Sequence, residues 1–180
     1  MPAVEIRPAK ENDIPQLVRL DHSYTTDHVW QMDFEIGEEQ FTATFRRVRL
    51  PRAVRVDYPR SPRSLTEDWF NRAGLLIAAV EGEIVGYASL TVESVPQTIR
   101  LTDLTVTSGM RRRGIASALV LASLEWTATQ PHHRRLVVEM QPKNDPAISL
   151  ALKLGFDFCG YADHHFPNGD TALFFTKWVR

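Results

Sequence analysis

An arginine-rich segment in the second half of the chain has the composition of a phosphate site. Residues 104–117 read LTVTSGMRRRGIAS, which indicates the end of a strand, a short basic loop and the start of a helix. Free amides at a helix N-terminus point toward an anion, and the helix dipole favours negative charge there. Gly114 would let a ligand approach the backbone closely. The P-loop pattern and the Rossmann Gly-x-Gly-x-x-Gly pattern are both absent.

Hydrophobic patterns predict the elements that position this loop. Three strands joined by short turns, over 75–80, 84–93 and 98–107, form an antiparallel meander. Helical spacing follows from Ile115 to Trp126, through Ala118, Leu119 and Ala122, and leads into a strand over 135–140. A strand–helix–strand unit needs a right-handed crossover, so the strands on either side of this helix are predicted to be parallel.

The remaining elements complete a mixed fold. Asp145 is expected to cap a second helix, with Pro146 in its first turn and Gly155 at its end. The other predicted elements are a strand at 4–7, a helix from residue 12 or 13, strands within 29–36 and 40–48, a proline-rich loop over 51–62, and strands at 156–161 and 171–178. The fold class is therefore α/β (α+β), with a single mixed, mostly antiparallel sheet flanked by helices.

Length and composition narrow the class of protein. The 180 residues, 43% hydrophobic and 24% charged, indicate one globular domain over 1–180. A net charge of -1 argues against a nucleic-acid partner, and the apolar stretches are too short for a membrane span. The one cysteine, Cys159, cannot form an internal disulfide and is expected in the core, and the six histidines lack metal-ligand spacing. We expect a cytoplasmic protein without a metal.

Two motifs resemble one known family. Arg111-x-x-Gly114-x-Ala116 is similar to the acetyl-CoA motif of GNAT-type N-acetyltransferases, written Q/R-x-x-G-x-G/A. Residues 144–156, NDPAISLALKLGF, resemble the second motif of that family, N-x-x-A-I-x-L-Y-x-K-L-G-F. The resemblance extends from about Leu75 to the end of the chain, whereas residues 24–70 match no known pattern.

The resemblance implies acetyl-CoA as cosubstrate and direct transfer of the acetyl group to an amine, with two splayed central strands. The backbone around Leu104, Thr105 and Val106 would bind the pantetheine arm, and Asn144 would contact the cofactor near the splay. The loop and helix start would hold the pyrophosphate, with the amides of Arg112 to Ser117 around it. The implied loop residues are Arg111, Arg112, Arg113, Gly114, Ile115, Ala116 and Ser117.

One position departs from the family motif. Ala151 stands where a tyrosine often protonates the leaving thiolate, and alanine has no proton to donate. Tyr161, His164 and His165 are alternative donors. A CoA thiol has a pKa of roughly 8.5, so the thiolate can also leave with help from water.

The general base is expected among two carboxylates. Glu139, near the end of the strand that should splay from its neighbour, is the predicted base, and Asp103, within that neighbouring strand, is the next candidate. Either could accept the proton that a protonated amine must lose before it attacks. Alternatively, Glu139 only hydrogen-bonds a neighbouring backbone group or arginine, and Asp103 is structural.

The acceptor is less clearly indicated. Residues 101–104, 117–119, 124–126 and 136–141 resemble streptothricin-type acetyltransferases, which acetylate an amine on an antibiotic. This match lies mostly in the half that binds the cofactor, so it indicates little about the substrate. A small-molecule amine is the first hypothesis for the acceptor. A protein N-terminus or a lysine is the alternative acceptor, and a non-catalytic acetyl-CoA sensor is the alternative function. The chain is also a candidate homodimer. Trp30, Glu35 and Asp163 are candidate substrate contacts.

Two charge runs bear on the acceptor. Six acids and no Lys or Arg fall between Asp21 and Glu39, and seven arginines with one acid fall between Arg46 and Arg63. They form either two solvated faces that pair with each other, or an acidic rim and a basic rim for charged substrates.

Overall fold

A computed structural model describes residues 3–179 of the chain. Its elements are β1 (Val4–Pro8), η1 (Glu11–Asp13), α1 (Ile14–Arg19), β2 (Tyr24–Ile36), β3 (Phe41–Val56), α2 (Ser64–Asp68), η2 (Trp69–Asn71), β4 (Gly74–Val80), β5 (Glu83–Val92), β6 (Thr98–Val106), η3 (Ser108–Met110), α3 (Ile115–Thr129), β7 (Arg135–Met140), α4 (Asp145–Lys153), β8 (Asp157–Ala162) and β9 (Ala172–Trp178). Within the described residues, the helices are all too short or too polar to cross a bilayer.

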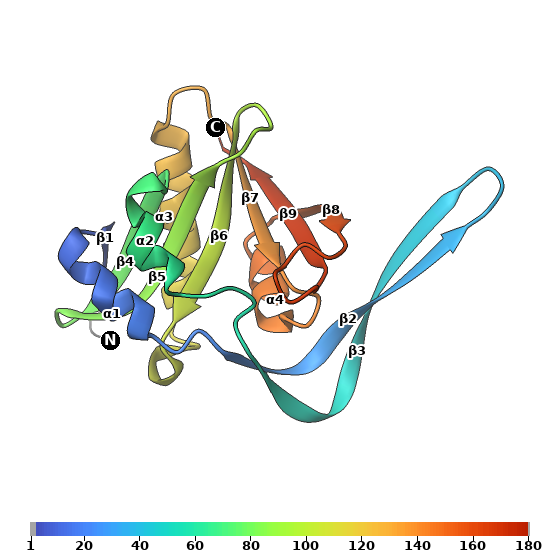
Figure 1. Cartoon of the computed structure of the whole chain (residues 1–180), viewed down its shortest axis with the longest axis horizontal. Helices are drawn as coiled ribbons and strands as arrows, with labels where there is room; N and C mark the ends of the chain where they lie inside the picture. The colour runs from blue at the N-terminus through green and yellow to red at the C-terminus, as the bar shows by residue number, and fades with distance from the viewer. Residues whose placement is uncertain (1–2, 180) are drawn as a thin grey trace.

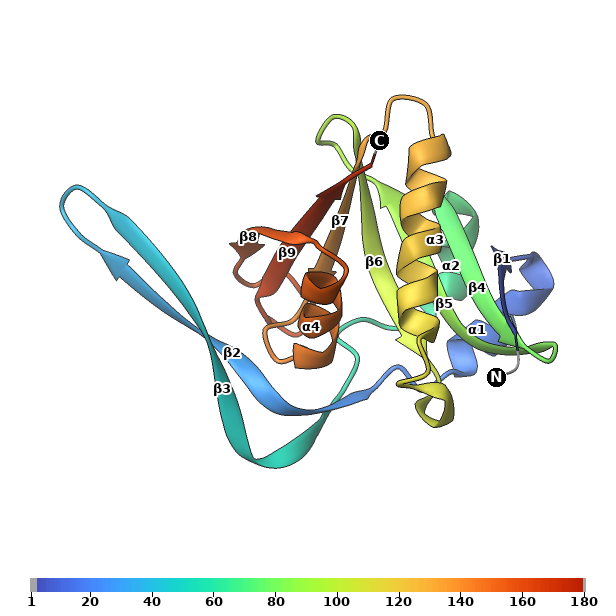
Figure 2. The ribbon, with the colours of Figure 1, turned by 180° about the vertical axis from the view of Figure 1, so that it is seen from behind.

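A seven-stranded sheet runs through the body in the order β1-β4-β5-β6-β7-β9-β8. Strands β4, β5 and β6 form the predicted antiparallel meander, and β6 and β7 are parallel, as the crossover through α3 requires. Helices α1 and α2 lie on one face of the sheet (Figure 1), and α3 and α4 lie on the other (Figure 2). The predicted mixed α/β fold is confirmed.

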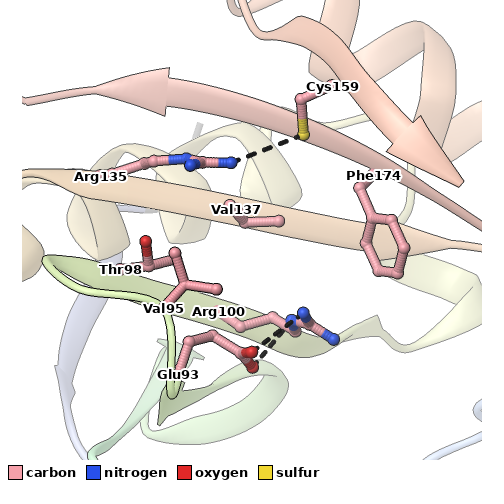
Figure 3. Close-up of a pocket in the computed structure, with 8 residues that line it drawn as sticks. All are labelled: Glu93, Val95, Thr98, Arg100, Arg135, Val137, Cys159 and Phe174. Carbon is pink, nitrogen blue, oxygen red and sulfur yellow. Dashed lines mark hydrogen bonds and ion pairs between the residues drawn. The ribbon is translucent and has the colours of Figure 1, made fainter.

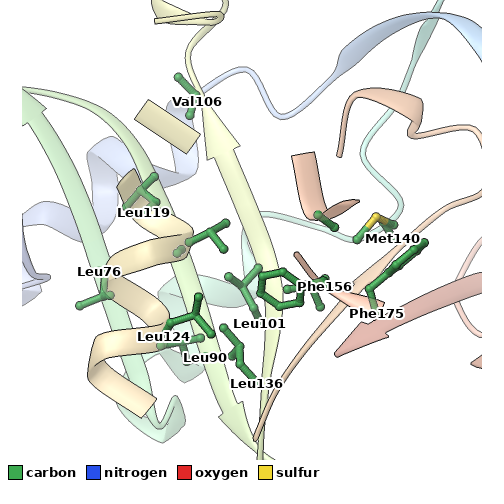
Figure 4. Close-up of a cluster of buried hydrophobic side chains, with 14 of the residues drawn as sticks. Leu76, Leu90, Leu101, Val106, Leu119, Leu124, Leu136, Met140, Phe156 and Phe175 are labelled. Atoms are coloured by element: carbon green, nitrogen blue, oxygen red, sulfur yellow. The ribbon is translucent and has the colours of Figure 1, made fainter. Parts of the chain in front are cut away.

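The larger hydrophobic core fills the space between the sheet and the helices α3 and α4 (Figure 4). The buried stripe of α3 is rotated from the predicted one, because Ser123 and Thr127 are fully buried while Ala122 and Trp126 are only half-buried. The two hydroxyls donate to the carbonyl oxygens of Leu119 and Ser123 at 2.7 and 2.8 Å. Since these bonds satisfy the hydroxyls inside the helix, the core accepts polar residues that hydrophobic spacing does not reveal.

Strands β6 and β7 pair only at one end. Their ladder covers four residue pairs, from Thr98–Arg135 to Leu101–Val138, after which the strands diverge (Figure 1). Strand β6 then continues to Val106 with β5 along its other edge. That contact is close, because a Cβ on Gly86 of β5 would lie 2.5 Å from the carbonyl oxygen of Thr105. The splay leaves one edge of β6 open over residues 102–106.

Strands β2 and β3 form a separate two-stranded arm that projects from the body (Figures 1 and 2). The predicted loop over 51–62 is wrong in its first half, since β3 extends to Val56. The ladder shifts register between Thr26, which faces Val54, and His28, which faces Arg49. The residues between Arg49 and Val54 therefore bulge, and Pro51 fits there because it has no amide hydrogen to give to a ladder.

Candidate active site

The open edge of β6 and the start of α3 lie at the same end of the sheet. Leu104, Thr105 and Val106 all follow the last β6–β7 pair, so their backbone groups on that edge can bind a ligand. After Val106 the chain makes one short turn, η3, and enters α3 at Ile115. The loop predicted for the pyrophosphate therefore follows directly after the three backbone positions predicted for the pantetheine arm.

Gly114 makes the helix start accessible. It is the N-cap of α3 with φ +83°, and in the described part of the chain no side chain caps the helix. A Cβ at this position would meet no atom within 4 Å, so the space beside Gly114 is open, and the first amides, those of Ile115, Ala116 and Ser117, follow directly. Uncapped amides at a helix N-terminus suit a phosphate oxygen. These residues fit the pyrophosphate of acetyl-CoA.

The three arginines of the loop have different surroundings. The Arg111 guanidinium donates to the carbonyl oxygens of Val106, Asp21 and Ser23 at 2.8, 3.0 and 2.7 Å, so it ties the loop to the segment before β2. Arg112 and Arg113 are exposed. Of the three side chains, these two are free to meet a phosphate.

Asn144 takes the capping role that was predicted for Asp145, and Asp145 has a different role. Asn144, and not Asp145, caps α4, because its Oδ1 accepts from the amide of Ala147 at 3.2 Å. The buried Asp145 carboxylate instead accepts two hydrogen bonds from Arg47, at 2.7 and 2.8 Å, and one from the indole of Trp30, at 3.1 Å. Asp145 therefore fastens the arm to the body.

Glu139 lies one residue beyond the last β6–β7 pair, where the strands begin to diverge. Its side chain is 1% exposed. Arg60 donates to Oε1, Arg100 donates to Oε2 at 2.9 Å, and the His165 Nε2 lies 3.1 Å from Oε2. The carboxylate is thus held by two cations, as in the alternative role considered for it. Both of its oxygens are therefore already occupied by contacts within the protein.

Asp103 has an oxygen available on the same side of the sheet. Burial raises the pKa of the Asp103 carboxyl to about 7, and the charge of Glu139 adds to the rise. Its Oδ2 accepts from the Thr102 hydroxyl at 2.8 Å, while its buried Oδ1 has no hydrogen-bond partner among the described residues. The nearest guanidinium nitrogens, of Arg60 and Arg72, are 3.8 and 3.9 Å away. Of the two candidate carboxylates, this is the one with an oxygen that accepts no hydrogen bond from the described residues.

The family can now be assigned. The profile of the Acetyltransferase (GNAT) family matches residues 37–156. The chain belongs to the GNAT acetyltransferase family. It is therefore an acetyl-CoA-dependent N-acetyltransferase, which sets aside the non-catalytic sensor.

Individual relatives differ in how much of the chain they match. A streptothricin acetyltransferase of Streptomyces lavendulae is 28% identical over 163 residues, 87% of this chain and 82% of the relative. An N-alpha-acetyltransferase of Sulfurisphaera tokodaii is 29% identical over 110 residues, 56% of this chain and 66% of the relative. The solved structure of a nourseothricin acetyltransferase shares the fold, with a TM-score of 0.81, 21% identity and 99% of each chain covered.

The motif tyrosine of the GNAT acetyltransferases has no counterpart here. Ala151 is buried in the core on α4. Among the candidate donors, His164 is exposed and Tyr161 packs its ring edge-on against Phe45. His165 is the one beside Glu139, held edge-on between the rings of Phe166 and Phe174.

The three candidate substrate contacts are not brought together. Trp30 is half-buried and lines a hollow of about 230 Å³ together with Lys143 and Asp170. Asp163 is exposed, and the hydroxyl of Thr171 donates to it and lowers its pKa. Glu35 lies on the outer half of the arm, which projects away from the body (Figure 1).

A second hollow, of about 140 Å³, lies at the paired end of β6 and β7 (Figure 3). Arg100 connects it to the candidate site, because its guanidinium lies 2.9 Å from both Glu93 and Glu139. Cys159, expected in the core, is instead exposed at this hollow, with Sγ 3.9 Å from Arg135. It lies on the edge strand β8, whose residues before Gly160 are exposed.

Several polar residues of the site had no sequence signal. Arg60 comes from the 24–70 segment, and its place in an arginine run suggested only a basic rim. The two charge runs do pair in part, since Arg46 bonds Asp33 at 2.7 Å and Arg55 lies 3.4 Å from Asp21. Arg47 and Arg60 instead reach the body.

Proposed function

We propose that this GNAT acetyltransferase acetylates a primary amine of a small, cationic molecule. The observation that carries the proposal is the pair of buried carboxylates, Asp103 and Glu139, where β6 and β7 part. Arg60 already pairs with Glu139, but Asp103 Oδ1 accepts no hydrogen bond among the described residues, so an ammonium group can donate to that oxygen. An amine approaching here would reach the open edge of β6 from the face covered by α1 and α2.

A small acceptor is favoured over a polypeptide for two reasons. Arg60 donates to the Thr102 carbonyl at 3.1 Å and lies 4.8 Å from the centre of the Phe166 ring, so the segment after β3 covers the acceptor side. The alignment with the streptothricin relative also covers 87% of the chain, so it includes part of the 24–70 segment that forms this cover.

We assign the proton transfer to Asp103. Bound acetyl-CoA supplies the acetyl group. Asp103 Oδ1 has no hydrogen-bond partner among the described residues, and the raised pKa makes the carboxylate basic enough to take a proton from an ammonium, directly or through water. Glu139 positions Arg60 and His165. A water molecule suffices for the leaving thiolate, whose thiol has a pKa of roughly 8.5.

Two variants with pH–rate profiles test this assignment. Asp103→Asn should lower kcat/KM by on the order of 10²–10⁴ at pH 7, with partial recovery at high pH, where more of the amine is already deprotonated. Glu139→Gln should cost less and keep a pH-dependent rise near pH 7. If Glu139→Gln abolishes that rise while Asp103→Asn retains it, the roles are reversed.

The acceptor class is tested by release of free thiol from acetyl-CoA. The panel contains a streptothricin, a free amino acid and a peptide with an unblocked N-terminus. We expect the highest kcat/KM with the cationic small molecule. A protein N-terminus is the second candidate because of the N-alpha-acetyltransferase relative. A peptide that exceeds every small amine would overturn the proposal.

A further inference from the structure

The arm formed by β2 and β3 has one apolar face along its outer half. Residues paired across two strands share a face of the ribbon. The pairs Met32–Phe45, Phe34–Ala43 and Ile36–Phe41 alternate with pairs such as Asp33–Thr44 and Glu35–Thr42. One face is therefore apolar to the tip, and the other is polar.

Only the base of this apolar face is covered by the body. The Phe45 ring lies 5.3 Å from the ring of Phe158 and 5.4 Å from that of Tyr161, both on β8. Toward the tip, Phe34, Ile36 and Phe41 are 48%, 71% and 76% exposed. The face thus continues from the core into solvent. A two-stranded ribbon alone is marginally stable in water, and an exposed apolar patch of this kind marks an interaction surface.

The charges of the arm are separated along its length. Residues 32–44 contain Asp33, Glu35, Glu38 and Glu39 and no Lys or Arg. The basal part of β3, residues 45–55, contains five arginines and no acid. Within residues 3–179, exposed Glu35, Glu38 and Glu39 at the tip, and exposed Arg49 and Arg52 at the base, have no ion-pair partner. The tip is acidic and the base is basic.

We infer that the outer arm packs against the arm of a second copy of this chain, antiparallel and with the apolar faces inward. A two-fold axis repeats each contact, so the outer halves meet through their exposed apolar faces and the acidic tip of each copy points toward the exposed Arg49 and Arg52 of the other. A parallel arrangement would place like charges together, which disfavours it. The charge pattern therefore favours a second copy over an unrelated partner, because the acidic tip of one arm is complementary to the basic base of another.

Light scattering after size-exclusion chromatography tests the interface. The wild-type chain should elute with twice the monomer mass of 20.5 kDa. Phe34→Ser with Phe41→Ser should give the monomer mass. The matched control, Thr42→Ser with Thr44→Ser, changes the polar face of the same segment and should remain dimeric. A monomeric wild type, or a dimeric Phe34→Ser/Phe41→Ser protein, overturns the inference. Unchanged acetyl-CoA binding shows that each variant is folded.

Charge reversal tests the orientation of the two arms. Glu38→Arg with Glu39→Arg should weaken the dimer at least tenfold, because arginines then face Arg49 and Arg52. Adding Arg49→Glu and Arg52→Glu should restore it. If the tip reversal leaves the dimer Kd unchanged, the tip does not lie along the partner's base and the antiparallel arrangement is wrong.

Discussion

Replacing Gly114 by alanine should weaken acetyl-CoA binding because the added methyl group contacts the ligand and not the protein. The position has φ +83°, and an added Cβ would contact no atom of the protein within 4 Å. The methyl group would instead enter the open space beside the N-cap of α3, where the pyrophosphate is expected. Gly82, in the turn between β4 and β5, has the same φ of +83° and the same empty surroundings, and it provides a matched control.

The expected changes in Tm and in Kd separate the loss of stability from the loss of acetyl-CoA affinity. Alanine in this left-handed conformation costs roughly 1–2 kcal/mol, and the cost should be similar at the two positions. Each should therefore lower the Tm by a similar amount, roughly 2–4 °C per kcal/mol for a domain of this size. At Gly114 alone, the methyl also prevents a charge-assisted hydrogen bond worth about 1.5–3 kcal/mol, which raises Kd roughly 10- to 150-fold.

Calorimetric titration with acetyl-CoA, combined with thermal unfolding, measures both quantities. The expected result is a similar fall in Tm for Gly114→Ala and Gly82→Ala, with weaker binding only for Gly114→Ala. Equal affinities in the two variants would refute the placement of the pyrophosphate at the start of α3.

Three further perturbations test the buried charges. Asp103→Asn should flatten the pH dependence of the free energy of unfolding between about pH 4 and 7. The pKa of Asp103 in the folded protein is raised to about 7, so in the wild type the stability that this group contributes falls as pH rises through that window. Urea titrations at several pH values measure this dependence. Arg47→Met should destabilise the protein by about 1–3 kcal/mol above pH 5, because it leaves the buried Asp145 carboxylate without its cation and with the Trp30 indole as its remaining side-chain donor. The loss of stability should be smaller in acid. The hydrogen bond from Arg47 lowers the pKa of Asp145 in the folded protein, so the stabilisation by this pair disappears as pH falls through that pKa. An equal loss of unfolding free energy at pH 3 and pH 7 would argue against the pair. Arg60→Ala should move the pH–rate profile to higher pH, because removing this nearby cation raises the pKa of the Asp103 carboxyl further, and an unmoved profile would separate Arg60 from the base.

The cofactor half was predictable because local patterns determine it. Short turns between apolar runs predict β4 to β6, the crossover rule makes β6 and β7 parallel, and a glycine before a helical pattern marks Gly114 as the start of α3. The buried hydroxyls of α3 were missed, because their satisfaction depends on bonds within the helix that hydrophobic spacing does not register.

The acceptor half depends on contacts distant in sequence. Arg60 contacts Glu139, which is 79 residues away in the sequence, and Arg47 contacts Asp145, which is 98 residues away. No local sequence pattern predicts either pair. Asp103 was a candidate base from its position alone, but its free oxygen and raised pKa come from burial beneath other elements. The arm was predicted only in part, because Pro51 suggested a loop where a bulge lets β3 continue.

Hydrogen exchange with and without acetyl-CoA tests the cofactor site most directly. The open β6 edge over residues 102–106 and the amides of residues 112–117 should exchange more slowly in the complex, while the tip of the arm, residues 34–41, should exchange at the same rate. Protection confined to other segments, with residues 102–106 and 112–117 unchanged, would contradict binding of acetyl-CoA between β6 and the start of α3.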